Sequence, residues 1–130
     1  MKEVMDFLTA NGVFYLATAD GDQPQVRAMG FVMEYEGKLA FCTSNDKPMF
    51  KQMKANPKVS FCSVDKEMKT LRVCGKVRFC TSPESQKKAL EVMPALANMY
   101  KVGDGKFEIF CLEDAKAIVQ SMSGEVKTLL

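Results

Sequence analysis

The stretch from Pro24 to Pro57, PQVRAMGFVMEYEGKLAFCTSNDKPMFKQMKANP, decides the fold class. It begins with an extended run over residues 24–35, turns at Glu36-Gly37 and returns through residues 38–43, which predicts a β-hairpin. Residues 48–56 then predict a short amphipathic helix, because apolar and lysine side chains alternate there at helical spacing. The proline that closes the stretch ends this helix. The stretch therefore predicts paired strands followed directly by a short helix.

The sequence on both sides of this stretch adds further elements. Upstream, residues 2–10 predict a short helix and residues 13–19 predict a strand rich in β-branched and aromatic residues. Downstream, residues 58–64 and 70–81 predict a second strand pair, in which Gly75 marks a bulge or bend. These patterns predict further antiparallel strands before and after the first hairpin in the sequence.

The last third of the chain begins with a helix signal. Ser82 can cap a helix and Pro83 can occupy its first position, so we expect a helix through about Met93. Residues 107–111 then predict a strand, and residues 115–130 predict two more. The sequence therefore predicts a mainly β fold, with six or seven antiparallel strands forming a small barrel flanked by two or three helices.

The composition narrows the class of protein. The chain has 130 residues, of which 47% are hydrophobic, and this is enough for one domain, residues 1–130, with a real core. The net charge of +2 is too even to indicate a nucleic-acid binder. No apolar run is long enough to span a membrane and the N-terminus lacks a signal-peptide pattern, so we expect a cytoplasmic protein.

The chain contains no histidine, which excludes several kinds of site. Ser-His-Asp and Cys-His nucleophiles, histidine-ligated zinc and haem held by a proximal histidine are all impossible. Any chemistry at neutral pH must come from another group or from a bound cofactor. We predict no catalytic side chain and no metal site.

The five cysteines do not form a CxxC motif, so neither structural zinc nor a thioredoxin-like site is indicated. Each has an apolar neighbour in the sequence, and we expect all five to be small buried thiols in a reducing compartment. They are Cys42, Cys62, Cys74, Cys80 and Cys111.

One segment has the pattern of an anion site. Arg27 lies in an extended run in which Ala28 and Gly30 point to the opposite face and leave room for a flat group. The next strand ends in Thr43-Ser44-Asn45, and Lys47 leads into a helix N-terminus. Hydroxyls, a lysine, free amide groups and an arginine fork suit a phosphate. The alternative is that these are ordinary surface charges and a helix cap.

The order of short segments resembles the pyridoxamine 5′-phosphate oxidase-like family of FMN-binding split β-barrels. The segments that carry the resemblance are residues 14–18 (FYLAT), 23–27 (QPQVR), 37–43 (GKLAFCT), 47–48 (KP), 56–59 (NPKV) and 71–77 (LRVCGKV). The resemblance implies a six-stranded antiparallel split barrel flanked by helices. It also implies a homodimer with FMN at the subunit interface, where each subunit supplies half of the cleft.

The resemblance further implies a set of cofactor-binding residues: Arg27, Ala28, Met29, Gly30, Cys42, Thr43, Lys47 and Lys51. Arg27 matches the family arginine that reaches the FMN phosphate, and residues 28–30 match the stretch whose backbone lines the isoalloxazine ring. Cys42 and Thr43 match a pair beside the ribityl–phosphate chain. Lys47 or Lys51 matches the basic phosphate ligands that follow, with two registers possible. Thr70 and Arg72 fall near a position that contacts the ring.

The chain departs from the vitamin-specific oxidases, which carry tryptophan and arginine in a C-terminal segment. It has no tryptophan and no arginine after Arg78, so it is similar instead to the short general-stress-type members. We therefore expect an FMN-dependent oxidoreductase that acts on an unknown small molecule, and not a pyridoxamine phosphate oxidase. The alternatives are a non-catalytic flavin or haem module, a deazaflavin-dependent reductase, and a dimeric barrel that has lost its cofactor.

Overall fold

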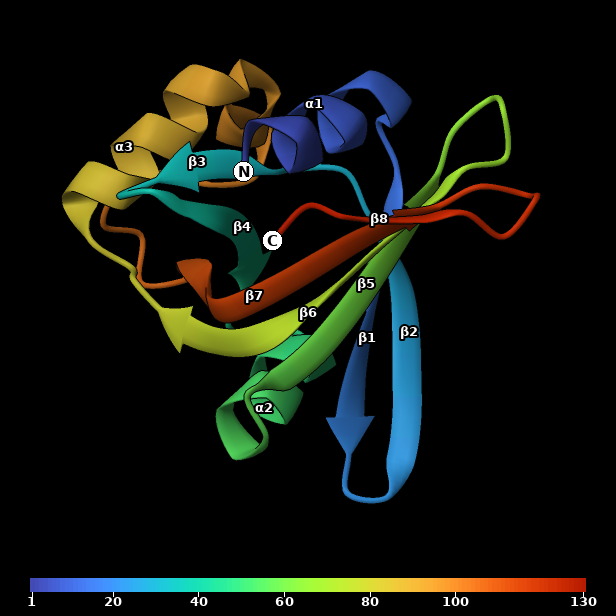
Figure 1. The fold of residues 1–130 in the computed structure, drawn as a ribbon. Coiled ribbons are helices and arrows are strands. Elements are labelled where there is room, and N and C mark those ends of the chain that lie inside the picture. Colours follow the sequence, from blue (N-terminus) through green and yellow to red (C-terminus); the bar gives the residue numbers. More distant parts are fainter.

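Eight antiparallel strands form one strongly curved sheet in the computed structural model, which describes residues 1–130. The strands are β1 (Phe14–Asp20), β2 (Gln23–Met29), β3 (Met33–Tyr35), β4 (Lys38–Ser44), β5 (Lys58–Val64), β6 (Thr70–Phe79), β7 (Phe107–Gln120) and β8 (Val126–Thr128). Their order in the sheet is β2-β1-β5-β6-β7-β4-β3, with β8 paired to β7 (Figure 1). No ladder joins β2 to β4 or β3, so the barrel is split there. The predicted mainly β split-barrel class is confirmed.

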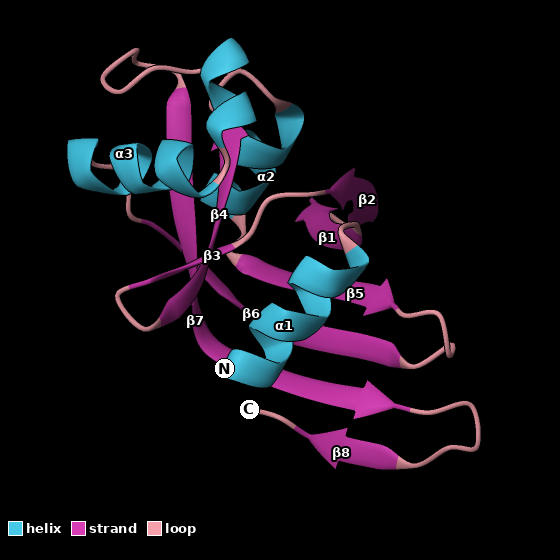
Figure 2. Ribbon diagram, turned by 90° about the horizontal axis from the view of Figure 1, so that it is seen from above, coloured by secondary structure: helices cyan, strands magenta, loops and turns pink.

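Three α-helices and a short 3-10 helix accompany the sheet (Figure 2). They are α1 (Lys2–Asn11), α2 (Pro48–Ala55), α3 (Pro83–Val92) and η1 (Pro94–Asn98). The predicted start of α3 is confirmed, because the Ser82 hydroxyl accepts a hydrogen bond from the Ser85 amide and Pro83 opens the helix. None of the helices is long and apolar enough to cross a membrane.

The strand count of eight exceeds the six or seven that the sequence predicts. The extended run over residues 24–35 is two strands and not one, because β2 pairs with β1 while β3 pairs with β4 at the other end of the sheet. Conversely, two of the three strands expected after residue 107 merge into the single 14-residue strand β7, and the third is the separate strand β8. Both corrections concern pairing between distant segments, which local patterns do not encode.

The predicted turn and the predicted bulge that shape the sheet are both present. The β3–β4 hairpin turns at Glu36-Gly37, where both residues have positive φ values, of 51° and 76°. The β6–β7 ladder shifts register between Cys74 and Lys76, as expected for a bulge at Gly75. The bulge bends the sheet and helps it to curl into a barrel.

The interior contains two apolar clusters on opposite sides of the curled sheet. The larger cluster is built around four phenylalanine rings, Phe14, Phe41, Phe61 and Phe110, whose contacting centroids lie 5.3–5.6 Å apart. The second cluster packs beneath α3 and η1 and includes the stacked pair Tyr100 and Phe107, 4.4 Å apart. Facing strands are thus joined across the barrel by aromatic packing in place of the missing ladder.

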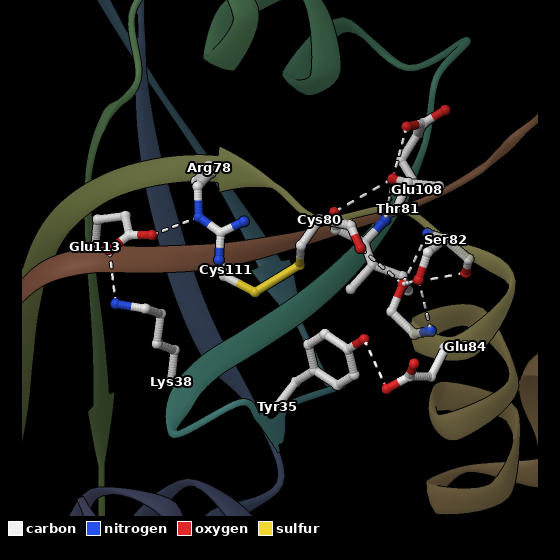
Figure 3. The surroundings of a disulfide bond; sticks show 12 residues. Tyr35, Lys38, Arg78, Cys80, Thr81, Ser82, Glu84, Glu108, Cys111 and Glu113 are labelled. Atoms are coloured by element: carbon white, nitrogen blue, oxygen red, sulfur yellow. Dashed lines mark hydrogen bonds and ion pairs between the residues drawn. A yellow bond between two sulfur atoms is a disulfide. The ribbon is translucent and has the colours of Figure 1, made fainter.

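The cysteines differ from the expectation of five buried thiols. Cys80 and Cys111 form a disulfide between the end of β6 and β7 (Figure 3). Cys42 is buried, but Cys62 is only partly buried and Cys74 is exposed. The prediction was wrong for these four residues because alternation along β5 and β6 turns Cys62 and Cys74 to the outer face, and the pairing of β6 with β7 brings the other two together.

Candidate functional site

The split of the barrel leaves two strand edges without a strand partner. The edge strand β2 pairs only with β1. On β4, the ladder with β3 covers Lys38–Ala40, so residues 41–44 have a strand partner on the β7 side alone. Helix α2 follows β4 and packs against β1. Free backbone groups at an edge are able to bind a ligand as well as another strand.

Arg27 is anchored at this split by three neighbours. Its Nη1 donates to the Thr18 hydroxyl at 2.7 Å and to the Leu16 carbonyl at 3.3 Å, and its Nη2 donates to Gln52 Oε1 at 2.8 Å. The Thr18 hydroxyl in turn donates to the same Gln52 oxygen at 2.6 Å. The guanidinium group is therefore fixed between β1 and α2.

The same contacts leave some N–H donors of the Arg27 guanidinium unused. A guanidinium carries five N–H donors, and the contacts above use three of them. Partial burial removes solvent from the charge and lowers the pKa of Arg27 from its ordinary value, although such a group stays protonated. A half-buried, immobilised cation with unused donors is suited to binding an anion.

Both candidate lysines lie on or next to α2. Lys51 is exposed and precedes Gln52, and the two line a depression of about 200 Å³ between the β1–β2 turn and α2. Lys47 occupies the N-cap position of α2, where no side chain caps the helix. Lys51 is thus placed beside the Arg27 anchor, and Lys47 at the start of the same helix.

The predicted pair on β4 lies at the open edge, but its side chains are buried and do not face the site. Cys42 and Thr43 are 9% and 2% exposed. Cys42 belongs to the second apolar cluster, and strand alternation turns Thr43 to the opposite face, which it shares with Phe41. Burial raises the pKa of the Cys42 thiol to about 11, partly offset by the nearby Lys47 charge. Only the backbone of these residues, on the open edge of β4, is placed to contact a ligand.

The predicted ring-lining stretch continues from β2 into the crossing segment. Ala28 and Gly30 are exposed and Met29 is partly buried against the barrel core. An added Cβ at Gly30 would meet nothing closer than the Gly12 carbonyl oxygen at 3.7 Å. The backbone there is accessible to a flat group. Arg72, in contrast, lies on the outer face of the sheet opposite Cys62, away from Arg27.

Two residues of this corner, Thr18 and Gln52, were missed by the sequence analysis. Both are buried polar side chains, at 4% and 9% exposure. Gln52 lies on the inward face of α2, and this polar residue among apolar ones was the available signal. No group of three or more cysteine or acidic side chains is arranged to hold a metal ion.

Fold and site together define an antiparallel split β-barrel with a half-buried, anchored arginine at its open edge. The family model described as pyridoxamine 5′-phosphate oxidase matches residues 1–117. The chain therefore belongs to the pyridoxamine 5′-phosphate oxidase-like family. No curated protein matches the sequence.

Solved structures agree with this assignment. A NimC/NimA family protein from Clostridium acetobutylicum is 43% identical, with a TM-score of 0.95 over 99% of this chain and 90% of that one. General Stress Protein 26 from Bacillus anthracis is 14% identical, with a TM-score of 0.75 over 98% of this chain and 97% of that one. A heme-binding protein from Mycobacterium smegmatis is 15% identical, with a TM-score of 0.73 over 95% of this chain and 55% of that one. The last two likenesses show the fold alone.

Proposed function

We propose that the protein is an FMN-binding flavoprotein, and that it works as an oxidoreductase on a small acceptor. The observation that carries this proposal is the anchored guanidinium of Arg27, which keeps unused donors at the split of the barrel. The planar N–H donors of a guanidinium match the oxygens of a phosphate dianion. Membership of the family, whose implied cofactor is FMN, supports the same assignment.

Each group at the split has a role in holding the cofactor. Arg27 binds the phosphate, and Lys51 adds positive charge from the adjoining turn of α2. Thr18 and Gln52 orient the guanidinium and do not touch the ligand. The backbone of residues 28–30 would line the flavin ring, and the open edge of β4 would hold the chain between ring and phosphate.

The flavin ring, when bound, supplies the electron transfer, which explains how a chain without histidine can be an enzyme. The buried Cys42 thiol stays protonated at neutral pH because its pKa is raised, so it is not a nucleophile. Asp20 lines the same depression as Lys51 and Gln52 and is the one carboxylate there.

We further propose that a second copy of the chain completes the site. The edge strand β2 presents Val26, which is 69% exposed. Tyr15 on β1, which is paired with Ala28 on the same face, is 46% exposed. An open edge flanked by exposed apolar side chains is suited to pairing with an identical surface across a two-fold axis.

The expected cytoplasmic location stays a prediction.

Extraction of the cofactor from purified protein tests the choice of FMN. We expect mass spectrometry of the heat-released ligand to give FMN in up to one equivalent per chain. Release of a deazaflavin or of haem would replace FMN in the proposal. If the protein carries no ligand and added FMN does not bind, the proposal is wrong.

A turnover assay distinguishes an enzyme from a binding module. We expect the bound flavin to be reduced by a nicotinamide nucleotide and reoxidised by an added acceptor over repeated cycles. A flavin that binds but does not cycle with any donor would identify a storage or sensing module, which is the alternative function.

A further inference from the structure

Three lysines gather on the outer face of the sheet, away from the Arg27 corner. Lys58 on β5 and Lys76 on β6 are directly paired across the ladder, and Lys116 on β7 is paired with Cys74 on the same face. Arg27 belongs to the opposite face, because it is paired with the buried Leu16 while the exposed face of β1 carries Ala17. The lysine cluster is therefore a separate feature.

The lysines border a groove with a floor of small residues. The groove has a volume of about 440 Å³, and Ala17, Ser60, Cys74 and Gly75 line it between the lysines. Short side chains in the middle and long ones at the rim make a concave site in which the ammonium groups can turn inward. The Ser60 hydroxyl adds a hydrogen-bond donor to the floor.

The positive charge in this groove exceeds the negative charge around it. Like charges placed directly opposite on neighbouring strands are destabilising, and Lys58 and Lys76 have this arrangement. No ion pair or hydrogen bond engages the ammonium group of Lys58, Lys76 or Lys116, although other lysines pair with carboxylates. Asp114 lines the groove without forming an ion pair. Glu113 is paired with Lys76 across the β6–β7 ladder, but its carboxylate is engaged by Lys38 and Arg78, so the three lysines outnumber the free carboxylates beside them. Uncompensated charge in a concave site attracts a polyanion.

We propose that this groove binds the polyphosphate group of a small molecule, either free or carried by a nucleotide. Lysine ammonium groups bind phosphates as point charges, and two adjacent phosphates can bridge the Lys58–Lys76 pair while Lys116 closes the third side. The groove shares Ala17, Ser60, Cys74 and Lys116 with an adjoining apolar depression. Tyr15 and Val26 of the proposed dimer surface also line this depression, so a base that lies there would contact the second copy of the chain as well. The proposal does not depend on flavin binding.

Calorimetric titration of the purified full-length protein tests the site, with inorganic pyrophosphate, ADP and adenosine as probes. We expect saturable binding of pyrophosphate and ADP that weakens as salt is added, and no binding of adenosine. ADP that binds more tightly than pyrophosphate assigns the site to a nucleotide, and equal affinities assign it to free polyphosphate. Absence of saturable binding for both phosphate probes would overturn the proposal.

Matched variants locate the binding. In the double variant K58Q/K76Q we expect affinity for ADP to fall by about tenfold or more, because two charge-assisted contacts are lost. Its fold should be kept, since the change removes a like-charge pair on an exposed face. The control K87Q/K101Q removes two exposed lysines elsewhere and should bind within about twofold of wild type.

A third variant separates this groove from the flavin site. R27A should leave pyrophosphate and ADP binding intact, even if FMN binding is lost. Binding that is abolished by R27A and unchanged in K58Q/K76Q would place the phosphate at the split of the barrel, and would refute the lysine groove while supporting the Arg27 corner.

Discussion

Gly75 is the residue at which the sheet tolerates no side chain. A Cβ there would lie 2.7 Å from Leu112 Cγ and 2.8 Å from the Glu113 carbonyl oxygen, on the neighbouring strand β7. The absence of a side chain is what lets β6 and β7 approach at the bulge that bends the barrel. The requirement is steric, because the φ value of Gly75 is not positive.

We predict that Gly75→Ala lowers the free energy of unfolding by about 1–3 kcal/mol, the usual range for overpacking. Denaturant titration measures this loss. Gly30→Ala is the matched control, because its added Cβ meets only ordinary contact at 3.7 Å. A Gly75 variant as stable as the Gly30 variant would show that the two strands can separate at no cost.

At the scale of elements, the disulfide joins the end of β6 to β7 and closes a loop that contains α3 and η1. Cys80 and Cys111 are 31 residues apart, and a cross-link over such a loop is worth about 3–4 kcal/mol by the chain-entropy model. Because α3 is also held by its cap and by the second apolar cluster, we expect it to stay folded when the bond is broken.

We predict that dithiothreitol, or the double substitution C80S/C111S, lowers the free energy of unfolding by up to this amount and leaves the far-ultraviolet dichroism unchanged. Denaturation curves with and without reductant measure the effect. The control C62S/C74S should remain sensitive to reductant. Equal stability of oxidised and reduced wild type would show that the bond adds nothing to the fold.

Glu113 links three neighbouring strands through two cations. Its carboxylate lies 2.6 Å from Lys38 Nζ on β4 and also accepts a hydrogen bond from Arg78 Nε on β6 (Figure 3). These partners lower the pKa of Glu113 below its ordinary 4.5. The stabilisation is therefore present above that value, and is lost as the pH falls through the lower pKa of the folded state.

We predict that wild-type stability falls as the pH drops below about 4.5 and that E113Q shows a shallower fall. Some dependence should remain, because the pKa values of Asp46 and Asp104 are also lowered. Thermal unfolding between pH 3 and 7 measures the slopes. E91Q, which changes an exposed glutamate, is the control and should show the same pH dependence of stability as wild type. If E113Q also showed the wild-type pH dependence, this account would be contradicted.

At the scale of the whole molecule, the sequence predicts elements better than their arrangement. The hairpin at Glu36-Gly37, the cap at Ser82 and the bulge at Gly75 are confirmed because each depends on local chemistry. The break between β2 and β3 and the Cys80–Cys111 pair depend on which strands meet, and no local pattern encodes that. For the same reason Arg27 could be picked out, whereas its partners Thr18 and Gln52 could not.

The proposed homodimer places β2 at the interface. We predict that Val26→Lys, which puts a charge on a side chain that is 69% exposed in the single chain, converts the dimer to a monomer and weakens FMN binding. Sedimentation velocity gives the oligomeric state. Val102→Lys, at another exposed valine that is 45% exposed, should remain dimeric. A monomeric wild type, or a dimeric V26K, would exclude this interface.

The central claim is that Arg27 holds a flavin phosphate at the split of the barrel, and titration of the flavin-free protein with FMN tests it most directly. We predict saturable quenching of flavin fluorescence by wild type, and a dissociation constant about 10- to 100-fold higher for R27A, because charge-assisted hydrogen bonds of roughly 1.5–3 kcal/mol are lost. R78A, which removes an exposed arginine away from the split, is the control. Tight FMN binding by R27A equal to that of wild type, or no FMN binding by wild type, would contradict the account.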